Sequence, residues 1–187
     1  MKSPFSFIVQ PIGGTRYVNK KEIEGIDLVV SSSEENHKAS NRMAEVLETP
    51  IGYKGSVRKG DVLLVHHNVF KFYNDMYGRK KSGKSFFKDD LFFVDGDQFY
   101  MYRRGDDWVA HDKYCFIKPI KKLTKSIDTN DKEEPLMGEM IYPNSYMKSK
   151  GVEKGNIVAY QPGCNYEFIV DGERMYRLYD HQITMVL

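Results

Sequence analysis

Two segments of this chain occur twice, and this internal repeat restricts the possible folds more than any other feature. Residues 57–65 (VRKGDVLLV) return as residues 152–160 (VEKGNIVAY). Residues 93–100 (FVDGDQFY) return as residues 169–176 (IVDGERMY). Each copy places a glycine-containing turn beside apolar and β-branched residues, which is typical of strands joined by tight turns. Because repeated sequence indicates repeated structure, the chain is predicted to hold two small β-modules in tandem.

The two predicted modules cover residues 1–110 and 111–187 and follow each other without a flexible linker. A further echo supports the division, since residues 116–120 (FIKPI) repeat the pattern of residues 8–12 (IVQPI). No stretch rich in glycine and serine separates the modules, so we expect them to pack together. Helical periodicity is almost absent. The predicted fold class is therefore all-β, with at most one short helical turn.

Charge and composition exclude several classes of function. The 28 basic and 26 acidic residues leave a net charge of +2, so the general electrostatic argument for nucleic-acid binding is missing. The two cysteines lie at unrelated places in the modules and indicate neither a disulfide framework nor a thiolate zinc site. No run approaches the roughly 18 apolar residues of a membrane span, and the first residues lack the apolar core of a signal peptide. A cytoplasmic protein that binds neither nucleic acid nor membranes is expected.

Two polar segments interrupt the first module. Residues 19–41 are rich in serine and nearly free of aromatic residues, a composition that predicts a long loop, either functional or disordered. Residues 73–90 form a second insertion, rich in lysine, glycine and serine. The β-branched and aromatic residues 62–72 before it predict a single strand. After it, the Asp95-Gly96 dipeptide predicts a two-residue hairpin turn.

No credible active site can be assembled from the reactive residues. His66 and His67 are adjacent in a predicted strand, where they would point to opposite faces and could not share a metal ion. Residues 79–84 (RKKSGK) resemble a phosphate loop but lack its first glycine and its strand-to-helix setting. The paired carboxylates fall at predicted turns: Asp89-Asp90 and Asp106-Asp107. The protein is therefore predicted to be no enzyme and to use no metal or cofactor.

The order of the motifs resembles the GroES-like co-chaperonin family over essentially the whole chain, once in each module. Members of that family combine a His-Asp-Arg start, a Gly-Glu-Val strand, a Val-x-x-Gly-Asp-x-Val turn and a closing Asp-Gly-Glu-x-Tyr segment. The second module supplies the matching residues in order: His111-Asp112-Lys113, Gly138-Glu139-Met140, residues 152–158, residues 171–176 and a final strand at residues 181–186. The resemblance implies two tandem GroES-like barrels, each antiparallel and partly open.

The resemblance also implies a docking site in the long loop of the first module. Co-chaperonins bind their chaperonin through an Ile-x-Leu tripeptide that follows a glycine. This chain carries Gly25, Ile26, Asp27, Leu28 and Val29 at the matching place. Asp27 departs from the family, which usually has an apolar residue between the two aliphatic ones. One such loop would bind weakly, so useful affinity requires several loops in a homo-oligomeric ring.

These features predict a co-chaperonin that caps a GroEL-type chaperonin ring and assists ATP-dependent protein folding. Residues 121–135 of the second module hold no Ile-x-Leu after a glycine, and the segments that replace the family's roof hairpin are short. Phage-encoded co-chaperonins diverge in similar ways, which would place the protein in a host cytoplasm. The alternative is a viral structural or assembly protein that reuses the GroES-like fold and binds a virion partner through the loop and the basic insertion.

Overall fold

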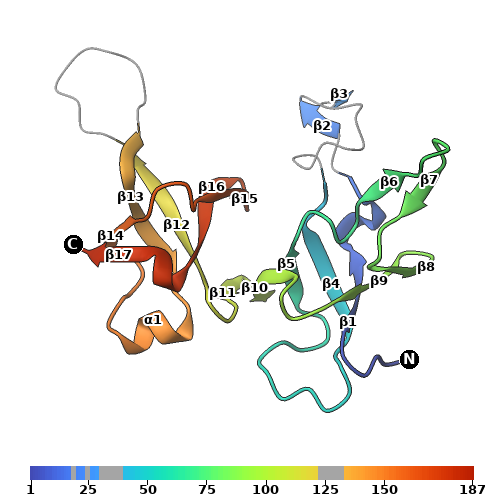
Figure 1. Cartoon of the computed structure of the whole chain (residues 1–187), viewed down its shortest axis with the longest axis horizontal. Coiled ribbons are helices and arrows are strands. Elements are labelled where there is room, and N and C mark those ends of the chain that lie inside the picture. The colour runs from blue at the N-terminus through green and yellow to red at the C-terminus, as the bar shows by residue number, and fades with distance from the viewer. Residues whose placement is uncertain (18–19, 24–25, 30–39, 122–132) are drawn as a thin grey trace. The chain divides into compact units, whose positions relative to one another are not determined.

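Both parts of the chain are built from antiparallel sheets, which confirms the all-β class. The computed structural model describes residues 1–17, 20–23, 26–29, 40–121 and 133–187. The chain divides into two compact units, which we call unit 1 (Met1–Asp107) and unit 2 (Trp108–Leu187) (Figure 1). The division falls inside strand β11 (Asp107–Ala110), whereas the sequence predicts a boundary after residue 110.

Unit 1 centres on one sheet and carries two separate hairpins. In addition to β11, the strands of the sheet are β1 (Phe7–Pro11), β4 (Met43–Glu48), β5 (Val62–Val65), β8 (Phe86–Lys88), β9 (Leu91–Val94) and β10 (Phe99–Arg104). They lie in the order β11-β10-β5-β4-β1-β9-β8. The hairpins are β2 (Lys20–Ile23) with β3 (Ile26–Val29), and β6 (Phe72–Asn74) with β7 (Lys80–Ser82). A 3-10 turn, η1 (Ile12–Gly14), follows β1.

Unit 2 forms a six-stranded sheet in the order β15-β16-β12-β13-β14-β17. Its strands are β12 (Tyr114–Lys121), β13 (Glu133–Tyr142), β14 (Ile157–Tyr160), β15 (Tyr166–Val170), β16 (Glu173–Tyr179) and β17 (Ile183–Val186). The helix α1 (Ser145–Ser149) lies between β13 and β14, and the 3-10 turn η2 (Asp180–Gln182) precedes β17. The short α1 agrees with the expected single helical turn.

The two sheets repeat one topology. Read from β10, unit 1 has the order β10-β5-β4-β1-β9-β8, and unit 2 read from β17 has β17-β14-β13-β12-β16-β15. The pairing of β1 with β4 also matches that of β12 with β13, since Val9 lies opposite Val46 and Ile117 opposite Met140. A register shift precedes Val9 and Ile117 alike. The internal repeat of the sequence is therefore a repeat of strand order.

The first repeated segment adopts the same turn in both units. In unit 1 the carboxylate of Asp61 accepts a hydrogen bond from the amide of Arg58 (2.7 Å). In unit 2 the side chain of Asn156 accepts from the amide of Glu153, also at 2.7 Å. The glycine inside each turn has a positive φ, 85° at Gly60 and 93° at Gly155. Glycine is required there because this region is strained for other residues, which explains why both copies share Lys-Gly.

The second repeated segment does not place equivalent strands, and the predicted Asp95-Gly96 hairpin is wrong. Strand β9 pairs with β1 and β8, whereas β10 pairs with β5. Neither Asp95 nor Gly96 has a positive φ, but Asp171 (50°) and Gly172 (81°) do. The latter dipeptide joins the paired strands β15 and β16 with the positive angles that a two-residue hairpin needs. The sheet order instead makes β9 equivalent to β16, and β10 equivalent to β17.

A glutamine marks this equivalence in the chain. Gln98, which precedes β10, accepts a bond through Oε1 from the amide of Asp95 (2.9 Å). Gln182, which precedes β17, accepts the same bond from the amide of Tyr179 (2.9 Å). The backbone carbonyl of each glutamine accepts from the residue that follows the neighbouring strand, His66 at 2.8 Å or Gln161 at 3.0 Å. The two glutamines therefore hold equivalent corners.

Alanine substitutions at Gly172 and Gly96 should have different effects on stability. Gly172→Ala forces an L-residue to φ near 81°, which we expect to cost about 1–2 kcal/mol of unfolding free energy. At Gly96 a new Cβ meets open space and ordinary backbone, so Gly96→Ala should be neutral or slightly stabilising. Urea denaturation measures both variants. Equal losses of unfolding free energy in the two variants would contradict the assignment of a positive φ to Gly172 and not to Gly96.

The strand predicted over residues 62–72 is wrong in its second half. Strand β5 ends at Val65, and the amide of Val69 donates to the carbonyl of His66 (3.0 Å) in a turn before β6. Val69 and Phe70 are nevertheless buried in the core of unit 1. Because these apolar residues enter the core from a turn, they imitate the pattern of a buried strand.

Each unit has its own apolar core. In unit 1, Phe70 packs edge-to-face on Phe92 with ring centroids 4.8 Å apart, and both rings are buried. In unit 2, Ile117, Met140 and Leu178 are fully buried. Burial of such side chains stabilises each sheet. The sheet of unit 1 in turn supports the hairpins β2–β3 and β6–β7.

Candidate functional site

The predicted docking residues lie on a small sheet of their own. Strand β3, which begins with Ile26, pairs antiparallel with β2, and position 26 lies opposite position 23. Within the described residues this two-stranded sheet joins no other strand. Gly25 lies outside the described residues. The sequence predicts a long loop over residues 19–41, and the structure corrects this for residues 20–23 and 26–29, which form a hairpin.

Strand geometry separates the predicted docking positions into two sets. Alternate residues of a strand belong to the same face, so Ile26 and Leu28 share one face of β3 while Asp27 and Val29 belong to the other. In the backbone register, position 27 lies opposite position 22. The aspartate that interrupts the Ile-x-Leu motif therefore occupies the face opposite to the two aliphatic positions.

The docking segment, residues 18–39, is flanked on both sides by residues that are bonded to each other in unit 1. Tyr17 and Ser40 form an isolated antiparallel bridge on the two sides of residues 18–39. Asn41 is 4% exposed, and its amide nitrogen donates to the carbonyls of Ile12 (2.9 Å) and Thr15 (2.7 Å). These bonds tie the end of the segment to its start. These contacts cannot be predicted from the local sequence, which offers only a lone asparagine before β4 as a signal.

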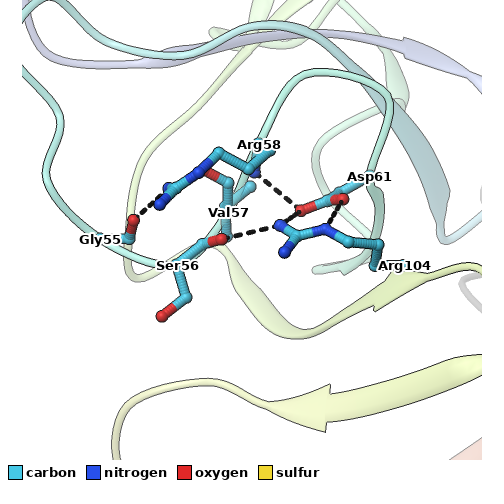
Figure 2. A network of polar contacts seen from close by, with 6 residues as sticks. All are labelled: Gly55, Ser56, Val57, Arg58, Asp61 and Arg104. Carbon is cyan, nitrogen blue, oxygen red and sulfur yellow. Dashed lines mark hydrogen bonds and ion pairs between the residues drawn. The ribbon is translucent and has the colours of Figure 1, made fainter.

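A polar network surrounds Asp61 at the turn before β5. Figure 2 shows Arg104 reaching the carboxylate of Asp61, with Nε on one oxygen (2.9 Å) and Nη2 on the other (2.7 Å). Nη2 also donates to the carbonyl of Ser56 (2.9 Å), while Arg58 donates to the carbonyl of Gly55. The hydrogen bond to Asp61 raises the pKa of Arg104. Because Asp61 is buried and accepts from three donors, the network stabilises a turn.

The two adjacent histidines lie together, which corrects the predicted placement on opposite faces. The ring centroids of His66 and His67 are 4.1 Å apart with planes tilted by 31°. The strand rule does not apply to them because β5 ends one residue earlier. Nδ1 of His66 accepts from the amide of Asn68 (3.1 Å). Throughout the described part of the chain, no group of three or more His, Cys, Asp or Glu side chains could hold a metal ion.

The other tempting segments form turns and strands. Residues 80–82 are strand β7, so the sequence that resembles a phosphate loop belongs to a hairpin and does not lead into a helix. Asp89 has a φ of 50° and lies in the turn between β8 and β9, as the sequence predicts. Asp90 lies in the same turn and Asp106 in the turn before β11, whereas Asp107 is the first residue of β11 and corrects the predicted turn at that position.

Both cysteine thiols are poor nucleophiles where they stand. Burial raises the pKa of Cys115 to about 12. Burial also raises the pKa of Cys164, whose Sγ donates to the carbonyl of Gln161 (2.7 Å). The reactive form of cysteine is the thiolate, and both groups are kept protonated near neutral pH.

Comparison with known proteins adds no relative. A scan against protein-family models finds no match, and a search of curated proteins finds no similar sequence. In the parts of the chain that the structure covers, no helix is long and apolar enough to cross a membrane.

Proposed function

We propose that this protein is a GroES-like co-chaperonin whose two partly open barrels lie in tandem and which caps a GroEL-type chaperonin ring. The observation that carries the proposal is the placement of the docking segment. It leaves the sheet after β1 and returns before β4 at the Tyr17–Ser40 bridge, and it holds Ile26 and Leu28 on a strand outside the main sheet. This activity needs no catalytic residue or cofactor of the chain's own, and it belongs in the cytoplasm, of a host cell if the chain is viral.

The energetics of docking favour an assembly with several copies. An aliphatic side chain contributes roughly 1.5–3 kcal/mol when it is fully buried in a groove of the partner. Ordering a flexible segment on binding costs on the order of 2–5 kcal/mol, so two aliphatic residues leave a small surplus. Several segments that bind one ring simultaneously raise the overall affinity without any new contact.

The edge of unit 2 offers a route to such an assembly. Among the described strands, β17 has β14 as its single neighbour, whereas its equivalent β10 has both β5 and β11. Met185 is 56% exposed and Val186 is 45% exposed on this edge strand. An open edge with apolar residues readily pairs with another chain. We infer that copies associate through β17 and close into a ring, which would hide these edges.

The second candidate is a viral structural or assembly protein with the same fold. It is favoured by one observation, the basic insertion, which forms the exposed hairpin β6–β7 in unit 1. Such a protein would use the hairpin to bind a virion partner and would have no need of the Ile26–Leu28 strand.

Co-purification with a chaperonin separates the two candidates. The full chain, mixed with a GroEL-type ring and nucleotide, should elute with the ring in size-exclusion chromatography. It should elute alone when nucleotide is omitted or the ring is left out. Elution apart from the ring under every nucleotide condition would reject the co-chaperonin proposal and favour the virion protein.

A further inference from the structure

The hairpin β6–β7 is a stiff projection of unit 1. The carboxylate of Asp75 accepts from the amides of Tyr77 and Arg79, each at 2.9 Å. It also pairs with the side chains of Arg79 (3.2 Å) and Lys81 (3.4 Å). Gly78 completes the tip with a φ of 73°. One carboxylate therefore closes the whole turn, and the tip has a defined shape before any partner binds.

The hairpin exposes apolar side chains at its tip, and the residues around them in the sequence are mostly basic. At its tip Met76 is 91% exposed and Tyr77 is 74% exposed. Residues 71–88 contain six basic residues and one acid, Asp75, although the whole chain carries only +2. Exposed apolar groups with a charged rim are typical of a protein interaction surface. The charge of the rim requires an acidic partner surface.

The base of this hairpin, at Phe72 and Ser82, contacts the residues that flank the docking segment. The amide of Phe72, at the start of β6, donates to the hydroxyl of Tyr17 (3.0 Å), and the two rings stack. Nη1 of Arg16 donates to Oγ of Ser82 at the end of β7 (2.9 Å), and the guanidinium lies 4.1 Å from the Phe72 ring centroid. Tyr17 also bridges to Ser40. Both strands of the hairpin are thus held at the point where the docking segment begins and ends.

We propose that β6–β7 is a second docking arm, which binds an acidic surface of the chaperonin beside the groove that takes Ile26 and Leu28. This inference rests on the proposed function, since it assigns both arms to one partner. The contacts of Arg16 and Tyr17 hold the hairpin beside the ends of the docking segment. A chaperonin that binds the docking segment therefore presents its neighbouring surface to the hairpin. The steering of a basic arm to an acidic surface raises the association rate.

A single-stranded nucleic acid is a poorer fit to this hairpin. Such ligands stack their bases on free aromatic faces beside a basic groove. Here cations already lie over three of the rings of the hairpin and its flank: Lys80 over Phe72 (4.1 Å), Arg79 over Tyr77 (5.0 Å) and Lys88 over Phe87 (5.7 Å). The most exposed tip residue is a methionine, which suits an apolar protein pocket.

Charge reversal of basic residues that follow the hairpin in the chain tests the second arm. Lys84→Glu with Lys88→Glu is expected to weaken capture by a GroEL-type ring about tenfold, because two attractive contacts become repulsive. The same double variant should flatten the dependence of affinity on salt. Met76→Ser should weaken capture several-fold without changing the salt dependence. The matched control is Lys148→Glu with Lys154→Glu, two exposed lysines of unit 2, which should leave capture unchanged.

The outcomes separate the second arm from the proposed function. If the unaltered chain is captured and the hairpin variants bind equally well, the second arm is rejected and the docking strand stands. If the unaltered chain is never captured, the co-chaperonin proposal fails and the second arm fails with it. Tight binding of fluorescent oligo-dT that the lysine variant abolishes would overturn the inference in favour of nucleic acid. Thermal melting confirms that every variant is folded.

Discussion

Ile26→Ser and Leu28→Ser are each expected to abolish capture by the chaperonin ring while leaving the melting temperature unchanged. Each substitution removes roughly 1.5–3 kcal/mol per segment at full burial, and this loss is repeated in every subunit of a ring. Folding should be unaffected, because among the described strands β3 pairs with β2 alone and joins no strand of the main sheet of unit 1. Pull-down on immobilised chaperonin with nucleotide, followed by thermal melting of the same samples, measures both effects.

Two further variants show whether the effect belongs to this face of β3. Ile169→Ser removes an exposed aliphatic residue (58% exposed) from a strand of unit 2 and should leave capture unchanged. Asp27→Val changes a position on the other face of β3 from Ile26 and Leu28, so it should alter capture much less than either serine substitution. Full capture of both serine variants, or a large fall in their melting temperature, would show that Ile26 and Leu28 are not docking residues.

The sequence allowed the repeated turn to be predicted because its requirements are local. A glycine with positive φ and a capping oxygen one residue later are enough to specify it, and both copies meet them at Gly60-Asp61 and Gly155-Asn156. The second repeat was misaligned for a physical reason. An Asp-Gly dipeptide favours a hairpin turn, but the pairing of the flanking strands depends on partners far away in the chain, and β9 finds its partner in β1.

The surroundings of the docking segment could not be predicted for the same reason. Asn41 bonds to the carbonyls of Ile12 and Thr15, and Tyr17 contacts Phe72. The contacts that hold the ends of the docking segment and the base of the hairpin therefore link residues far apart in sequence. The composition of residues 73–90 indicated a basic insertion. Its shape depends on Asp75, whose four bonds to the tip become evident only once the chain is folded.

The turn before β5 provides the second large expected effect, this time on stability. Asp61→Ala should lower the unfolding free energy of unit 1 by about 2–3 kcal/mol, because the amide of Arg58 loses its buried acceptor and the turn loses its cap. Asp61→Asn should cost less than half as much. It keeps an oxygen for that amide, as Asn156 does at the equivalent turn of unit 2 (2.7 Å), and loses mainly the charge that faces Arg104.

Hydrogen–deuterium exchange followed by mass spectrometry assigns this prediction to one unit, because its peptides report on each unit separately. In moderate urea, Asp61→Ala should speed amide exchange in the peptides of unit 1 and leave those of unit 2 unchanged. Asn156→Ala should do the reverse. Equal losses for Asp61→Ala and Asp61→Asn would contradict this account. They would show that the ion pair with Arg104, which has no counterpart at the neutral Asn156, stabilises the turn of unit 1 more than the bond to the amide does.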